Sequence, residues 1–97
     1  MSNINNSAAL SDEEAFREKV LTTFIKDGRL TNIPVKSKKR AVVLDYIAEM
    51  FEPERRYTEK EVNEIILTLH EDYCSIRREM ADTGRINRKD GIYWRDK

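Results

Sequence analysis

Apolar residues recur at helical spacing in four segments of the chain, which we predict to be helices at residues 11–25, 38–51, 59–69 and 73–83. In the first segment apolar side chains return every four positions, at Phe16, Val20 and Phe24. Its start carries Ser11 and Glu14, which form a capping box because each side chain satisfies a backbone N–H of the other residue. We expect this helix to end at Asp27-Gly28, where glycine tolerates positive φ.

The next two helices also begin at residues that are typical of caps. Ser37 is predicted to cap the second helix. Thr58 and Glu61 form a second capping box at the start of the third helix, which is the clearest helix start in the chain. Residues 29–34, which join the first two helices, are broken by proline and are predicted to form an extended connector.

After residue 84 the pattern changes from helical spacing to alternation around an Asp-Gly pair, which predicts a β-hairpin over residues 85–95. A three-residue loop, Lys89-Asp90-Gly91, would set Ile86 opposite Trp94 with Ile92 on the same face. A two-residue loop would set Ile86 opposite Arg95. We favour the three-residue loop because it gathers the apolar residues on one face. The other face would then hold Arg85, Asn87, Tyr93 and Arg95.

The order of these elements predicts the fold class. A helix, a short extended segment at residues 56–57, two further helices and a hairpin follow one another. This is the order of a winged helix-turn-helix, here preceded by an extra N-terminal helix, so the protein is expected to be mainly α with a small C-terminal β-hairpin. A chain of 97 residues has room for one core. We expect a single domain over residues 11–97 and a flexible leader over residues 1–10.

Composition excludes several classes of protein. The single cysteine and single histidine allow neither an internal disulfide nor a zinc site built from soft ligands, which favours a reducing, cytoplasmic setting. No apolar run approaches the roughly 20 residues that span a membrane, so we expect no membrane contact. The three glycines form no phosphate-binding loop. We expect no catalytic residues, no metal and no cofactor.

The net charge is zero, so any argument for nucleic acid rests on how charge is distributed. Residues 73–97 hold seven Lys or Arg against four Asp or Glu, and residues 36–57 hold six against four. Residues 58–72 hold one against five. Basic residues on the hairpin and at a helix start would suit phosphates of double-stranded DNA. The candidate DNA-binding residues are Lys38, Lys39, Arg40, Arg78, Arg85, Arg88 and Lys89.

The fourth helix argues against this hypothesis. Arg78 shares the outer face of that helix with Ser75, Glu79 and Asp82, and two carboxylates there would repel phosphates. The alternative is a module that binds a regulatory protein or an effector without touching DNA. Its candidate residues are Glu59, Glu61, Glu64 and Tyr93. The sequence leaves the oligomeric state open, a dimer included.

Four further features have structural explanations. Arg77 is expected to pair with Glu61, Glu64 or Asp72 and to fix helix packing. His70, at the end of an acidic helix, is expected to act as a cap in its protonated form. Cys74 has no histidine placed by sequence as its base. Hard metals prefer carboxylates, so Glu59, Glu61, His70, Glu71 and Asp72 could be considered as a nuclease-like metal site. Their spacing does not match any required ligand pattern, so a solvated acidic face is the expected explanation.

Several runs of residues make the chain recognisable as a member of a family. They are Gly28-Arg29-Leu30 with Ile33-Pro34, the run from Tyr57 to Asn63 (YTEKEVN), His70-Glu71-Asp72-Tyr73, Arg77-Arg78 and Gly91-Ile92-Tyr93-Trp94-Arg95. Together, from about Phe24 to Arg95, they resemble the bacterial domain of unknown function 2087. Similar domains occur alone or joined to a helix-turn-helix regulator. The resemblance implies a winged-helix-like fold and a role in transcription regulation.

Overall fold

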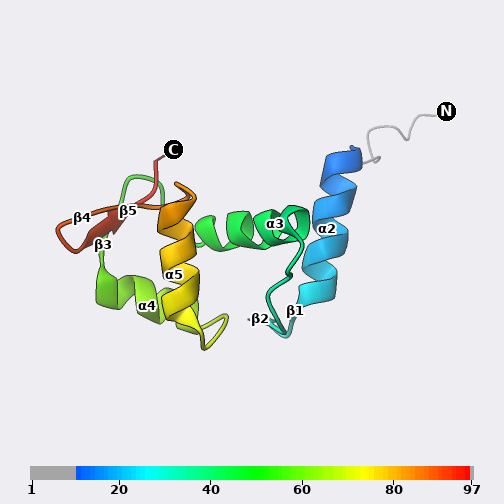
Figure 1. Ribbon diagram of the computed structural model, residues 1–97, viewed down its shortest axis with the longest axis horizontal. Helices are drawn as coiled ribbons and strands as arrows, with labels where there is room; N and C mark the ends of the chain where they lie inside the picture. Colours follow the sequence, from blue (N-terminus) through cyan, green and yellow to red (C-terminus); the bar gives the residue numbers. More distant parts are fainter. Residues whose placement is uncertain (1–10, 97) are drawn as a thin grey trace.

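The computed structural model describes residues 11–96, which form four helices and two small antiparallel sheets (Figure 1). The helices are α2 (Asp12–Phe24), α3 (Ser37–Ala48), α4 (Glu59–Leu67) and α5 (Tyr73–Asp82). The strands are β1 (Ile25–Lys26), β2 (Arg29–Leu30), β3 (Arg56–Thr58), β4 (Asn87–Lys89) and β5 (Ile92–Trp94). The mainly α class with a C-terminal hairpin is therefore confirmed. The predicted leader lies outside the described residues.

The helix starts follow the predicted caps in two cases of three. Both capping boxes form: Ser11 and Glu14 exchange hydrogen bonds of 3.0 and 3.1 Å, and Thr58 and Glu61 exchange bonds of 2.8 and 3.1 Å. The prediction that Ser37 caps α3 is wrong. The helix begins one residue earlier than expected, so the N-cap is Lys36 and no side chain caps this end.

Asp27-Gly28 forms a hairpin turn and not the expected helix end. The helix α2 stops at Phe24, and β1 pairs with β2 through Ile25↔Leu30. Both turn residues have positive φ, 52° at Asp27 and 77° at Gly28, as the two central residues of a type I′ turn do. The predicted connector thus begins with a strand.

The predicted register of the C-terminal hairpin (residues 87–94) is also wrong. The pairs are Asn87↔Trp94 and Lys89↔Ile92, which leaves a two-residue loop. The reason is again the turn, because Asp90 and Gly91 have φ values of 53° and 79°. A one-residue shift in register exchanges the two faces of a strand. Tyr93 is therefore buried, at 1% exposure, and does not lie on the exposed face that the sequence predicted.

The C-terminal hairpin is joined by β3 into a three-stranded sheet with β5 in the middle. Tyr57 of β3 lies opposite Tyr93 of β5, and both rings are buried. Beyond the strand, the guanidinium group of Arg95 donates two hydrogen bonds, of 3.0 and 2.8 Å, to the carbonyl oxygen of Phe51. The sheet is thereby fixed to the residues that follow α3.

One buried cluster joins α3, α4, α5 and the sheet, and it includes Val43, Ile47, Phe51, Tyr57, Val62, Ile66, Ile76, Met80 and Tyr93. The helix α2 stands at the other end of the molecule and packs on α3 (Figure 1). The strand β2 ties that end to the turn after α4, where the N–H of Leu30 donates to the carbonyl of Leu69 at 2.9 Å. Arg29 donates to the last carbonyls of α4, a favourable place for a cation.

The turn conformations predict how two substitutions in the C-terminal hairpin affect stability. Gly91→Ala should lower the free energy of unfolding by about 1–2 kcal/mol, because an L-residue is strained at positive φ. An added Cβ would meet no atom within 4 Å, so the cost is conformational alone. Asp90→Asn is the matched control, since Asn-Gly suits the same turn. Urea unfolding measures both variants, and equal stability of Gly91→Ala and the wild type would contradict this account.

Candidate nucleic-acid interface

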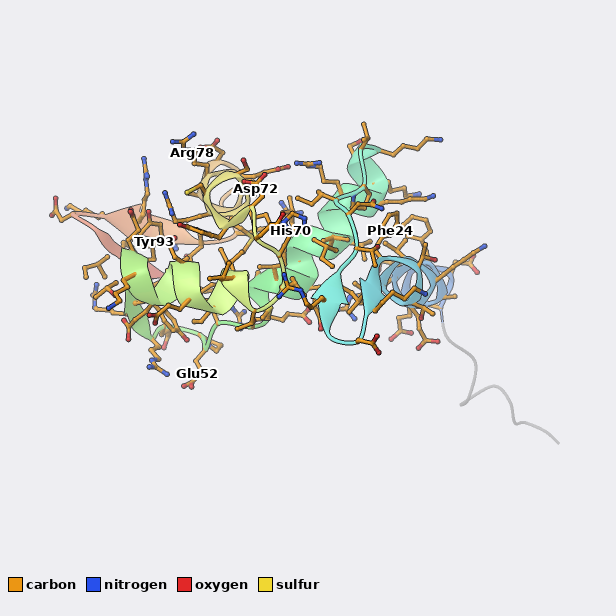
Figure 2. The ribbon with its side chains drawn as sticks, turned by 90° about the horizontal axis from the view of Figure 1, so that it is seen from below. Phe24, Glu52, His70, Asp72, Arg78 and Tyr93 are labelled. Carbon is orange, nitrogen blue, oxygen red and sulfur yellow. The ribbon has the colours of Figure 1, made fainter. Side chains whose placement is uncertain are left out.

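The helix α5 presents one face to the core and one to solvent. Ile76 and Met80 are buried, whereas Ser75, Arg78 and Asp82 are exposed. Figure 2 shows the Arg78 side chain pointing away from the body of the molecule, on the side of α5 opposite α4. This is the outer face that the sequence assigned to Arg78. The C-terminal hairpin lies beside α5 in both views.

Glu79 is held by a side chain from another helix. Both oxygens of its carboxylate accept hydrogen bonds of 2.6 Å from Arg40, whose third nitrogen donates to the carbonyl of Pro34 at 3.0 Å. The hydrogen bond from Arg40 lowers the pKa of Glu79, and the same bond raises the pKa of Arg40. One of the two carboxylates that argued against phosphate contact is therefore neutralised within the protein.

The same pairing changes the role of Arg40, which joins the start of α3 to α5. Arg85 is engaged in a similar way: its Nε donates to Asp45 of α3 at 2.7 Å. Two of the seven candidate cations thus have carboxylate partners across the α3–α5 contact. Nothing in the local sequence indicates these pairs, because their members lie about 40 positions apart.

Lys38 and Lys39 turn toward α2. The Lys38 ammonium lies 5.4 Å from the centre of the Phe16 ring. Lys39 lines a small hollow of about 150 Å³ together with Phe16, Val20 and Phe24. These two lysines are therefore close to the end of the molecule formed by α2, and Arg78 lies on the outer face of α5.

Arg88 and Lys89 are exposed at the end of β4. Arg88 is paired with Tyr93 in the hairpin register, so both side chains leave the same face of the sheet. An open hollow of about 350 Å³ lies against this tip and is lined by Glu59, Arg88, Lys89, Asp90, Gly91 and Tyr93. Within residues 11–96, neither cation of the tip has an ion-pair partner, and the same is true of Arg78.

A partly buried polar network connects the C-terminal hairpin to α5 through α4. The hydroxyl of Tyr93 donates to Glu59 at 3.0 Å, and the other Glu59 oxygen lies 4.0 Å from the Arg77 guanidinium. Arg77 also donates to the side-chain oxygen of Asn63 at 2.5 Å. Arg77 therefore fixes helix packing as predicted, but the partners differ from the predicted ones. Asn63 was missed, since an amide on a polar helix face gives no distinctive signal.

The acidic residues of α4 have mostly structural contacts. Glu61 completes the capping box, and the hydrogen bond from the Thr58 backbone lowers its pKa. Glu59 belongs to the network with Tyr93 and Arg77. Glu64 is exposed and lines an open hollow between α4 and the segment that follows α3. Of the residues proposed for protein binding, Glu61 thus belongs to a helix cap, and Glu59 and Tyr93 belong to the network with Arg77. Glu64 has no ion-pair partner among residues 11–96.

The remaining candidates have simple environments. Nδ1 of His70 accepts a hydrogen bond of 2.9 Å from the backbone N–H of Asp72, so the side chain stabilises the turn between α4 and α5. Cys74 is exposed. No group of three or more potential metal ligands is found within residues 11–96. None of the helices in that part of the chain is long and apolar enough to cross a membrane.

The outer face of α5 and the hairpin tip both lie in the part of the chain that matches a protein-family model. Residues 29–95 match the family model described as an uncharacterized protein conserved in bacteria (DUF2087). The chain belongs to the DUF2087 family. The DUF2087 region begins at β2 and contains α3, α4, α5 and the three-stranded sheet, whereas α2 and β1 precede it. No curated protein and no solved structure matches the chain.

The Arg40–Glu79 pair predicts how stability changes with pH. Glu79→Gln should lower the free energy of unfolding at neutral pH by about 1 kcal/mol. Hydrogen bonds to charged groups contribute more to stability than neutral ones, and the partial exposure of this pair reduces that contribution. The folded-state pKa of Glu79 is lowered, so its contribution is present above the usual carboxyl pKa and is lost as pH falls through the lowered value. The difference between wild type and variant should therefore shrink below about pH 4.

Urea unfolding at several pH values measures this effect. Glu49→Gln is a matched control, because Glu49 pairs with Arg17 on the surface and its side chain is 60% exposed. That variant should change stability little at any pH. A pH-independent difference between the wild type and Glu79→Gln would contradict the role assigned to the pair.

Proposed function

We propose that this protein is a DNA-associated winged-helix domain of a transcription-regulatory system. The order α3, β3, α4, α5, β4, β5 is that of a winged helix, with β3 paired to the last strand of the wing. In this arrangement α5 is the recognition helix that faces the major groove, and the C-terminal hairpin contacts the backbone beside it.

The observation that carries this proposal is the placement of Arg78, Arg88 and Lys89. All three are exposed, and no carboxylate among residues 11–96 pairs with them. Arg78 lies on the outer face of α5, and Arg88 and Lys89 lie near the tip of the C-terminal hairpin, which runs beside α5 in both views. Cations without intramolecular partners are available to neutralise phosphates, and this term dominates non-specific affinity.

One internal ion pair reduces the negative charge beside Arg78. Arg40 neutralises Glu79, the carboxylate next to Arg78, by a bidentate contact. Asp82 remains exposed on α5. Only Arg78 on this face has the side chain for strong base reading. We therefore expect binding that depends on phosphate contacts and has weak sequence preference.

The alternative is a protein-binding module that uses α4. Its support is weaker, because Tyr93 is buried and Glu61 is occupied in the cap. Exposed residues on that face of α4 include Lys60, Glu64 and Leu67, the last at 45% exposure. A protein that fails to bind DNA but whose partner complex is lost on Glu64→Lys would favour this alternative.

A titration on a labelled duplex of mixed sequence, at about 50 and 200 mM salt, tests the proposal by fluorescence anisotropy. Wild-type affinity should fall steeply with salt, since bound cations release counterions from DNA. Arg78→Glu, and separately Arg88→Glu with Lys89→Glu, should weaken binding and reduce the salt slope by roughly one per lost phosphate contact. These exposed changes should alter stability by only about 0.5 kcal/mol.

Lys60→Glu is the matched control, because Lys60 is an exposed lysine on α4, outside the proposed surface. Its affinity and salt slope should stay close to those of the wild type. Binding without salt dependence, or an equal loss in the control and the test variants, would show that α5 and the hairpin tip do not form the DNA-binding surface.

A further inference from the structure

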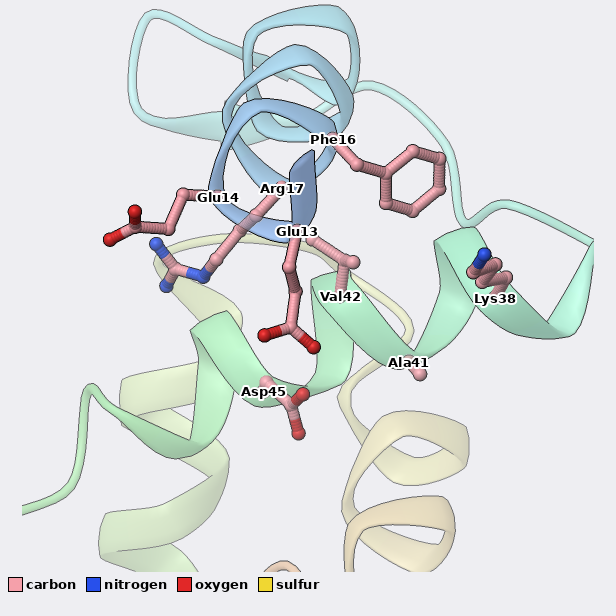
Figure 3. Close-up of a pocket in the computed structure, with 8 residues that line it drawn as sticks. All are labelled: Glu13, Glu14, Phe16, Arg17, Lys38, Ala41, Val42 and Asp45. Atoms are coloured by element: carbon pink, nitrogen blue, oxygen red, sulfur yellow. The ribbon is translucent and has the colours of Figure 1, made fainter. Parts of the chain in front are cut away.

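An open hollow lies between α2 and α3, away from α5. It has a volume of about 460 Å³ and is lined by Glu13, Glu14, Phe16, Arg17, Lys38, Ala41, Val42 and Asp45 (Figure 3). The helix α2 precedes the DUF2087 region, so half of this surface comes from residues beyond the family match. Neither the fold nor the DNA proposal assigns it a role.

Charge is arranged in order across the hollow. Figure 3 shows the carboxylates of Glu13 and Glu14 toward one side and the ammonium group of Lys38 on the other. Between them lie apolar side chains from both helices, Phe16, Ala41 and Val42, which are all partly exposed. The surface therefore has an acidic end (Glu13 and Glu14), an apolar centre and a basic end (Lys38).

The two ends do not neutralise each other within one molecule. Glu13, Glu14 and Lys38 have no ion-pair partner among residues 11–96. The other charged residues of the hollow are paired elsewhere: Arg17 with Glu49 at 2.8 Å, and Asp45 with Arg85 at 2.7 Å. The unpaired charges thus lie at the two opposite ends of the apolar centre.

We propose that this surface is the contact between two copies of the chain related by a two-fold axis through the apolar centre. A two-fold axis brings each patch onto itself in reverse, so an acidic end meets a basic end twice. Lys38 of each copy would face Glu13 and Glu14 of the other, and Phe16 and Val42 would pack across the axis. A patch with this order of charge is self-complementary, which singles out a second copy over a partner of one charge.

The position of the patch is compatible with the rest of the molecule. The helix α2 stands at the end opposite the three-stranded sheet (Figure 1). A dimer formed there leaves α5 and the C-terminal hairpin of both copies free. The inference does not rest on the proposed DNA function, and the two are tested by separate measurements.

Sedimentation equilibrium of the full chain over a wide concentration range tests the dimer. Lys38→Glu and Glu13→Lys each turn both symmetric contacts from attraction to repulsion, so each variant alone should dimerise roughly 10- to 100-fold more weakly than the wild type. An equimolar mixture of the two should dimerise about as strongly as the wild type. In the mixed dimer Glu at position 38 faces Lys at position 13, and the second contact retains the natural pair.

Glu13 is the better position for reversal because Glu14 belongs to the capping box of α2. Far-UV circular dichroism checks that both variants retain their helices, and Lys60→Glu should dimerise as the wild type does. A wild type that stays monomeric up to about 1 mM overturns the proposal. Variants that dimerise as the wild type does, or a mixture that associates no better than its components, overturn it equally.

Discussion

The type I′ turn at Asp90-Gly91 is the constraint on which the arrangement of the C-terminal half depends. Two positive φ values fix a two-residue loop, and the loop fixes the register of β4 and β5. That register buries Tyr93, whose hydroxyl reaches Glu59 at the start of α4. Glu59 in turn lies near Arg77 of α5. The turn therefore determines where the hairpin tip sits relative to the outer face of α5.

The seven candidate DNA-binding cations fall into three groups according to what surrounds them. Arg40 and Arg85 join α3 to α5 and its following turn, so they stabilise packing. Lys38 and Lys39 lie against α2. Arg78 is exposed on α5, and Arg88 and Lys89 are exposed on the C-terminal hairpin. Two of the seven candidate cations are thus occupied by carboxylates of the protein, whereas the three on α5 and the hairpin have no ion-pair partner among residues 11–96.

The helix α2 gives the molecule a second end with its own chemistry. It packs on α3, and the β1–β2 hairpin ties it to the turn after α4. This segment precedes the part of the chain that matches the DUF2087 family. In the two proposals made above, the α2 end of the molecule joins two copies of the chain and the α5 end binds DNA.

The sequence by itself determined the four helices, both capping boxes and the presence of a C-terminal hairpin, because these depend on contacts between residues a few positions apart. It also placed Arg78 on the outer face of α5 and gave Arg77 a packing role. The role of Asp27-Gly28 was predicted wrongly because the same dipeptide suits both a helix end and a type I′ turn. The hairpin register was predicted wrongly because the apolar pattern favoured a three-residue loop, whereas the turn at Asp90-Gly91 has two residues. Only the tertiary structure decided which cations are free. The partners of Arg40 and Arg85 lie about 40 residues away, and no local pattern records a contact made by folding.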